Sequence, residues 1–444
     1  MSVLVIGAAA LLVACPGQET DEDGDALDAP DARDNDAVSE PPSRTVHLGG
    51  WAESVTLSAG TLASPERLSA EPLGEPGDVE VVVIPLDLFG VPWDAFDGPN
   101  NQPTELPAEW LTQLSEAEAV VSELRSALSA ASSSTTEEPL ALHLVLAVSP
   151  ITRDGTALSP GTMELVGKAP QWENCFDPSA EGDPTRYGAR YAGYVNYLVN
   201  RFEPDAVILG RTMNRYEVAC GEAKYSAMLD VIHAAHDRLS EADVPPTTIV
   251  EVDVEDLYGY PKLPGRCVAM SPAECFETRR GLLGALRVDA LGLHSMPAVA
   301  LEELEAWTPD WLERVAEASP TDHSVVTSTS LPATSLSEQG PGGGPCIQIL
   351  ESEEALQRAW LTTVTMTAEA LEMLWVAWHP VRDLAPEEVV VSCPCSGDEE
   401  ICFYLDHVID ERATATRRSV SNGLWTHAGE PRLSGQQWLS EVQQ

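Results

Sequence analysis

Basic residues are scarce in this sequence of 444 residues, and their scarcity excludes some partners. Only 25 Lys and Arg stand against 71 Asp and Glu, which gives a formal net charge of −46 at pH 7. A field of this sign repels phosphate backbones, so we expect no nucleic-acid partner. A glycine-rich phosphate loop is also missing after the early apolar runs, which counts against a nucleotide-binding sheet. No repeat of fixed period is visible, so repeat architectures are set aside.

The first fifteen residues, MSVLVIGAAALLVAC, contain an apolar run, Val3–Ala14, that is too short to span a bilayer comfortably. Small and apolar residues lead into Cys15, which resembles the lipobox of bacterial lipoproteins. No Lys or Arg precedes the run, which departs from the usual start of a signal peptide. The resemblance implies a signal peptide over residues 1–15 and a lipid on Cys15. A plain signal peptide and a cytosolic start are the alternatives.

Residues 16–44 are rich in Asp, Glu, Pro and Ala and have no aromatic side chain. Such a segment cannot bury enough apolar surface to offset the entropy lost on ordering, so we expect a disordered acidic linker. A lipid anchor, this tether and a folded body over residues 45–444 predict an exported protein of the cell envelope. The anchor would attach it to a membrane, at the outer membrane or the periplasmic face.

The chain has nine cysteines, and eight remain when Cys15 is set apart: Cys175, Cys220, Cys267, Cys275, Cys346, Cys393, Cys395 and Cys402. An even number in an exported protein predicts disulfides. We expect Cys267 to pair with Cys275, because the two bracket a short loop. A zinc site formed by the last three cysteines and His407 is the alternative. Their spacing matches no strong metal pattern, so we expect no metal and no cofactor.

Short apolar runs alternate with amphipathic segments from residue 45 onward. Near-continuous hydrophobicity is typical of parallel strands covered on both faces. Eight runs are therefore candidate strands: Thr45–Leu48, Val79–Leu86, Leu142–Val148, Ala206–Leu209, Thr248–Val252, Ala290–Leu293, Ser324–Val326 and Leu371–Trp378. Apolar residues at helical spacing predict five helices: Pro107–Ala131, Tyr187–Phe202, Ala223–Leu239, Ala298–Ala316 and Ser352–Ala368. This alternation predicts an α/β fold, and eight strands favour a (β/α)8 TIM barrel over a doubly wound sheet. The segments 149–186 and 331–348 would be long loops at its catalytic side.

Four stretches carry a family resemblance. Tyr194 and the residues RFEPD, Arg201–Asp205, form a helix end before the fourth strand, and DAVILGRTMNRYE, Asp205–Glu217, contains that strand and its end. VVTSTSLP, Val325–Pro332, follows at strand seven, and NGLWTHAGEPR, Asn422–Arg432, precedes a last helix with Trp438. Their order and spacing over residues 45–444 resemble clan A glycoside hydrolases, closest to the arabinogalactan endo-galactanase-like barrels.

The resemblance implies two catalytic glutamates, at the ends of strands four and seven. A retaining glycosidase needs a protonated acid and an ionised nucleophile held about 5–5.5 Å apart. The family's acid/base falls on Thr212 and its nucleophile on Ser328, so neither position is a carboxylate. A threonine hydroxyl cannot serve as a proton donor near neutral pH, and a serine needs a neighbouring base to attack. Loss of hydrolysis is the first interpretation. Relocated carboxylates are the second, with these candidates: Glu217, Glu251, Asp253, Glu255, Asp256, Glu338 and Asp383.

Several other residues are candidates for binding a sugar. They are Arg211, Asn214, His294, Trp378 and the loop residue Trp172. Trp378 resembles the family's strand-eight tryptophan, which would place its ring under a sugar; core packing is the alternative. Arg211 could bind an acidic sugar or form an internal ion pair with Glu217, Glu251 or Asp253.

The predicted function is binding of a polysaccharide or glycan by an exported, lipid-anchored barrel with hydrolysis lost. The alternatives are an active, galactanase-like endo-glycosidase that uses relocated carboxylates, and a surface lipoprotein whose barrel serves protein contacts.

Overall fold

A computed structural model describes most residues between Val46 and Val442. The stretches of five or more residues that it does not describe are 1–45, 55–66, 69–79, 98–102, 133–142, 160–174, 179–183, 261–266, 298–307, 340–344, 380–422 and 425–429. Several predictions fall on these stretches and stay predictions. They concern Cys15, the linker 16–44, Trp172, Asp383 and the group formed by Cys393, Cys395, Cys402 and His407.

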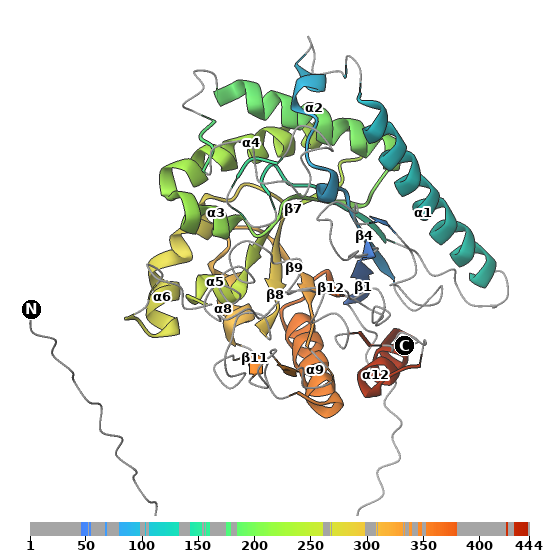
Figure 1. Cartoon of the computed structure of the whole chain (residues 1–444), viewed down its shortest axis with the longest axis vertical. Coiled ribbons are helices and arrows are strands. Elements are labelled where there is room, and N and C mark those ends of the chain that lie inside the picture. Colours follow the sequence, from blue (N-terminus) through green and yellow to red (C-terminus); the bar gives the residue numbers. More distant parts are fainter. Residues whose placement is uncertain are drawn as a thin grey trace, which may run out of the picture. The chain divides into compact units, whose positions relative to one another are not determined.

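Eight parallel strands close into a barrel in which neighbours along the chain pair with each other (Figure 1). The strands are β1 (His47–Trp51), β4 (Val81–Pro85), β5 (His143–Ala147), β6 (Ala206–Gly210), β7 (Thr247–Asp253), β8 (Ala290–Ser295), β9 (His323–Thr329) and β12 (Trp375–Trp378). Each coincides with one of the eight predicted runs, so the predicted (β/α)8 TIM barrel is confirmed. Two short antiparallel pairs lie outside the barrel: β2 (Glu53–Ser54) with β3 (Arg67–Leu68), and β10 (Ser337–Gln339) with β11 (Pro345–Gln348).

Helices surround the barrel (Figure 1). They are α1 (Ala108–Ser132), α2 (Pro184–Phe202), α3 (Met213–Cys220), α4 (Glu222–Ser240), α5 (Val254–Leu257), α6 (Pro272–Arg279), α8 (Asp310–Ala318), α9 (Glu354–Ala370) and α12 (Leu433–Val442). Four predicted helices match α1, α2, α4 and α9 within three residues at each end. Of the predicted Ala298–Ala316, the described part is helical from Asp310. None of the described helices is long and apolar enough to cross a bilayer.

Several strands extend beyond their predicted bounds, among them β9, which runs to Thr329 rather than to Val326. Two differences concern the last and the first strand. The last strand begins at Trp375 rather than at Leu371. Leu371 instead caps the end of α9, and Glu372 after it adopts a left-handed conformation with φ 51°. The first strand runs three residues beyond Leu48 to Trp51. This second difference matters for the site, because it places a tryptophan at the barrel mouth.

The core forms two layers, as period-two alternation along buried strands requires. One layer fills the barrel interior and includes Trp51, Val83, Ile249, Val325 and Ala377. The other lies between strands and helices and includes Trp378, which is completely buried. This position favours core packing for Trp378, one of the two roles that the sequence left open.

Candidate functional site

The candidate site lies at the carboxyl ends of the strands, where barrels of this architecture place their chemistry. Side chains alternate between the two faces of each strand, and at the strand ends the side chains on the interior face are polar. On β7, Glu251 lies two residues beyond the interior Ile249, and on β9 Thr327 lies two residues beyond the interior Val325. The interior of the barrel therefore changes from apolar to polar at its mouth.

Trp51, at the end of β1, forms an apolar floor beneath these polar groups. Its side chain is 1% exposed, and its indole N–H donates to the carbonyl of Thr327 at 2.7 Å. The guanidinium of Arg211 lies over the Trp51 ring, 4.3 Å from the ring centroid. A buried cation over an indole is held by the quadrupole of the ring, so Trp51 fixes both β9 and Arg211. Trp51 lies three residues beyond Leu48, the predicted end of the first strand, so the sequence did not indicate it.

Arg211 is held by two buried carboxylates. Its Nη1 lies 3.0 Å from Asp87 Oδ2, and its Nε lies 3.4 Å from Glu251 Oε1. The three side chains are 12%, 1% and 0% exposed, respectively. The internal ion pair anticipated as one alternative is therefore present with Glu251, and Asp87 is a further partner that the sequence did not indicate. The contacts leave Arg211 neutralised, which disfavours the acidic-sugar alternative.

Thr212, on which the sequence resemblance places the family's acid/base, is strained and buried. It begins α3 with φ 43° and ψ 42°, and its side chain makes no capping hydrogen bond. For a β-branched residue this left-handed conformation costs roughly 1–2 kcal/mol, and such strain clusters at functional sites. The Thr212 N–H donates to Glu251 Oε1 at 3.2 Å. Glu251 is thus a carboxylate in contact with the Thr212 backbone.

Ser328, on which the sequence resemblance places the family's nucleophile, is 1% exposed and is the register partner of His294 on β8. A register shift in the ladder at this point puts the two residues side by side on neighbouring strands. No hydrogen bond joins them in the described part of the chain, and the His294 Nδ1 is buried without a partner there. Burial lowers the pKa of His294, against the charges of Glu251 and Asp253, which raise it. The geometry therefore does not activate Ser328 as a nucleophile.

Asn214 and Asp253 tie α3 to β7. The Asn214 amide donates to the Asp253 carbonyl at 2.9 Å and accepts the Asp253 N–H at 2.7 Å, and the Asn214 side chain is completely buried. The Asp253 carboxylate caps α5 and pairs with Arg215 at 2.6 Å. Burial works to raise the pKa of Asp253, but the charges of Arg215 and His294 and the hydrogen bonds from Asp256 and Arg215 together outweigh it, so the net shift is downward. Both residues are engaged within the fold, so neither presents a free polar group to a ligand.

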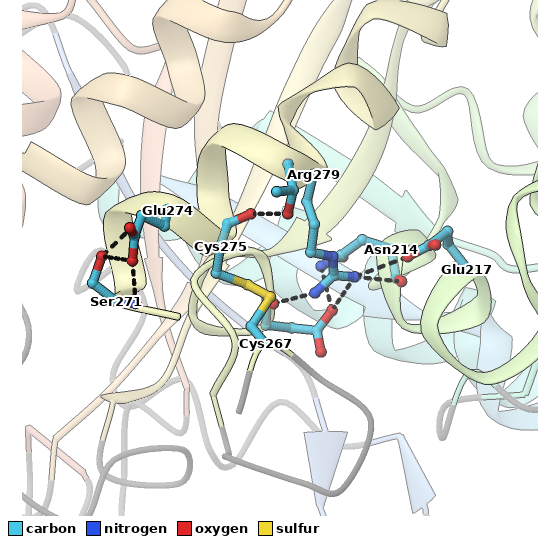
Figure 2. Close-up of a disulfide and its surroundings, with 9 residues drawn as sticks. Asn214, Glu217, Cys267, Ser271, Glu274, Cys275 and Arg279 are labelled. Carbon is cyan, nitrogen blue, oxygen red and sulfur yellow. Dashed lines mark hydrogen bonds and ion pairs between the residues drawn. A yellow bond between two sulfur atoms is a disulfide. The ribbon is translucent and has the colours of Figure 1, made fainter. Parts of the chain in front are cut away.

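Glu217 does not turn back toward Thr212. Its carboxylate pairs with Arg279 of α6 at 3.1 Å, and Arg279 also pairs with Asp256 at 3.0 Å. Figure 2 shows Arg279 reaching from α6 toward Glu217 and Asn214 beside the disulfide between Cys267 and Cys275. Glu217 and Asp253 thus serve separate ion pairs, and the structure does not bring them together as a catalytic pair.

Glu255 is a further buried carboxyl near the mouth. It is 1% exposed and accepts from the Ser295 hydroxyl at 2.6 Å and from the Met296 N–H at 3.2 Å. Burial, and then the charge of Asp253, raise the pKa of Glu255 to about 8. Glu255 therefore carries a proton at neutral pH. Because it is buried within the first turn after β7, it acts as a structural acid rather than a proton donor to a ligand.

The remaining candidate, Glu338, lies on β10, outside the barrel sheet. Its side chain lies outside the described residues.

Two disulfides hold segments that follow the strand ends. Cys267 pairs with Cys275, as predicted. Cys175, after β5, pairs with Cys220 at the end of α3, a link that the sequence did not assign. Among the described residues no group of three or more His, Cys, Asp and Glu could hold a metal ion.

Solved structures similar to this chain include galactanases, the family that the motifs resemble. A structure reported for fungal beta-1,4-galactanases has 13% identity and a TM-score of 0.45, covering 85% of this chain and 91% of its own. The GH53 catalytic domain of Ignisphaera aggregans has 8% identity and a TM-score of 0.43, covering 82% and 85%. A GH5 protein from Bifidobacterium longum, in complex with Manb1-4GlcNAc, has 12% identity and a TM-score of 0.49, covering 90% and 78%. At these identities the likeness is one of fold alone. No protein-family model matches this chain, and no curated protein sequence matches it.

Proposed function

We propose that this barrel binds a polysaccharide or glycan at its mouth and has lost the double-displacement hydrolysis of the glycosidases that it resembles. The observation that carries the proposal is the ion-paired group Asp87–Arg211–Glu251, which lies beside Thr212 at the former acid/base position. Double displacement needs one carboxylic acid and one free carboxylate facing the same bond. Here hydroxyl side chains stand at both positions, and the carboxylate nearest to Thr212 neutralises a guanidinium.

Binding at the mouth is supported by its mixed composition. Arg211 and His294 are partly exposed there, and the Arg211 guanidinium lies over the buried Trp51 ring. Sites for sugars use a few oriented polar groups. These two residues supply such groups on two different strand ends.

The test is calorimetric titration of the full chain, carrying Cys15→Ala, with β-linked galactan and mannan oligosaccharides. We expect a Kd between about 10 μM and 1 mM, and we expect His294→Ala to weaken binding at least about tenfold, which is about 1.4 kcal/mol. His323→Ala is the matched control, because this exposed histidine begins β9 at the opposite end of the barrel. Binding that is equal in the two variants would place the ligand elsewhere. No binding of any oligosaccharide would favour a barrel that serves protein contacts.

One contact favours a second candidate function, an active endo-glycosidase. Glu251 lies against the Thr212 backbone, where a relocated acid/base would have to be. Release of reducing sugar by the wild type, abolished in Glu251→Gln, would establish this alternative. We expect no release from either protein.

We also propose that the chain is exported and anchored to a membrane through a lipid on Cys15. The lipobox-like residues before Cys15 support this, and so do the two disulfides, which are typical of oxidising compartments. In a bacterial host, we expect palmitate labelling of the wild type and none of Cys15→Ala, with the wild type in the membrane fraction. Labelling that persists in Cys15→Ala would contradict the anchor.

A further inference from the structure

Three buried polar atoms on neighbouring strands lack hydrogen-bond partners in the described part of the chain. They are Glu251 Oε2 on β7, His294 Nδ1 on β8 and Thr327 Oγ1 on β9. Glu251 and Thr327 are completely buried, so water cannot freely solvate these atoms. Leaving such a group unpaired costs about 1–3 kcal/mol, and more for a charged one. Three orphaned groups at one place indicate a site made to bond something else.

The strand register brings the three residues together. Glu251 is the partner of Gly292, and His294 follows two residues later on the same face of β8. A Cβ on Gly292 would lie 2.7 Å from Thr327 Cγ2 and 3.2 Å from Glu251 Cα. Thr327 therefore packs directly over the β8 backbone, next to Glu251. The glycine is what permits this approach, and Glu251, Thr327 and His294 lie around it on adjacent strands.

The charge around these three residues is unbalanced. In the ion pairs described here, the carboxylates of Asp87, Glu251 and Asp253 meet the guanidinium groups of Arg211 and Arg215. Asp253 and Arg215 form one close pair, which leaves Arg211 to serve two carboxylates. Arg211 lies 3.0 Å from Asp87 but 3.4 Å from Glu251, so its ion pair with Glu251 is the weaker of the two. Glu251 Oε2 is the atom beside which a further positive charge would be stabilised most.

We propose that Glu251, His294 and Thr327 form a subsite for a protonated amine that bears neighbouring hydroxyl groups, which is the chemistry of an amino sugar. The inference rests on the proposed binding of glycans at the mouth and names the unit that is recognised. The ammonium group donates to Glu251 Oε2. A hydroxyl next to it bonds Thr327 Oγ1 and His294 Nδ1. An acidic sugar is rejected by the excess carboxylate, and an acetylated amine loses the charge that Glu251 requires.

The experiment compares glucosamine oligosaccharides with their N-acetylated counterparts by calorimetry on the full chain carrying Cys15→Ala. We expect the free amine to bind at least about tenfold more tightly. Work in about 0.15 M salt limits the long-range attraction of a cation to this acidic chain, since the Debye length is then about 8 Å. Glu251→Gln should abolish the preference. Glu241→Gln, which removes one exposed carboxylate, should keep it.

Thr327→Val separates a binding role from a structural one. The variant keeps the shape and removes an unsatisfied hydroxyl, so we expect its melting temperature to equal or exceed that of the wild type. We also expect it to bind the free amine at least about fivefold more weakly. Unchanged binding by this folded variant, or equal binding of amine and acetamide by the wild type, would overturn the subsite.

These outcomes are distinct from failure of the proposed function. Neutral oligosaccharides that bind without any amine preference leave the proposed function standing and remove the subsite. Glucosamine monosaccharide that binds in a Thr327-dependent manner, with no oligosaccharide binding, supports the subsite and removes the proposed function. Glucosamine and oligosaccharides that all fail to bind remove both.

Discussion

Replacing Arg211 with alanine is expected to lower the free energy of unfolding by about 3–5 kcal/mol. The substitution leaves Asp87 and Glu251 buried without their countercharge, and breaking a buried pair from one side costs that much. It also removes the cation from the Trp51 ring. Urea denaturation of wild type and variant, followed by tryptophan fluorescence, measures the loss.

The matched control is Arg238→Ala, because Arg238 pairs with Glu241 at the surface, where both side chains are more than half exposed. Such exposed pairs contribute about 0–1 kcal/mol. If Arg211→Ala does not fold, Arg211→Met combined with Asp87→Asn and Glu251→Gln replaces the group by neutral side chains and should fold. A loss below about 1 kcal/mol in Arg211→Ala would mean that the buried ion pairs do not hold the mouth together.

Replacing Glu255 with glutamine is expected to stabilise the protein at pH 8 and to flatten its stability between pH 5 and pH 8. The folded pKa of Glu255 is raised to about 8, well above its ordinary value of 4.5. The contribution of Glu255 to the free energy of unfolding is therefore fully present below pH 4.5, where the carboxyl is protonated in both states. It is lost as pH rises from 4.5 to about 8, because the unfolded chain releases the proton first. The loss is on the order of 4 kcal/mol across that window. Glutamine carries no charge; at every pH its carbonyl can accept from the Met296 N–H while its amide N–H donates to the Ser295 hydroxyl.

The measurement is a series of guanidinium denaturation midpoints at pH 5, 6, 7 and 8 for wild type, Glu255→Gln and the exposed control Glu241→Gln. The difference between wild type and Glu255→Gln removes the contribution of every other titrating group. Parallel pH profiles for these two proteins would show that Glu255 is ionised in the folded state at neutral pH.

The barrel could be predicted from sequence because its strands are covered on both faces. Runs such as AVIL at Ala206–Leu209 are apolar at every position, and eight of them separated by amphipathic helices leave few other folds. What the runs do not mark is where a strand ends. The residues Gly49 and Gly50 interrupt the hydrophobic signal after Leu48, so the extension of β1 to Trp51 was missed.

The site was harder to predict because its bonds join distant residues. Arg211 and Asp87 are 124 residues apart, and no local pattern signals their pairing. The same limit separates the two disulfides: the pair 8 residues apart was predicted, and the pair 45 residues apart was not. The placement of the family's two glutamates on Thr212 and Ser328 came from motifs and stays a prediction. The unpartnered oxygen of Glu251 could be found only once the register of β7, β8 and β9 was fixed.

The central claim is that the mouth holds a glycan without cutting it. The most direct measurement is mass spectrometry of the bound oligosaccharides after prolonged incubation with excess protein in heavy-oxygen water. Hydrolysis would break a glycosidic bond and place a heavy oxygen at the new reducing end. The account predicts that the oligosaccharides are recovered bound and intact, with no heavy oxygen incorporated. Shortened, labelled products that disappear in Glu251→Gln would contradict it.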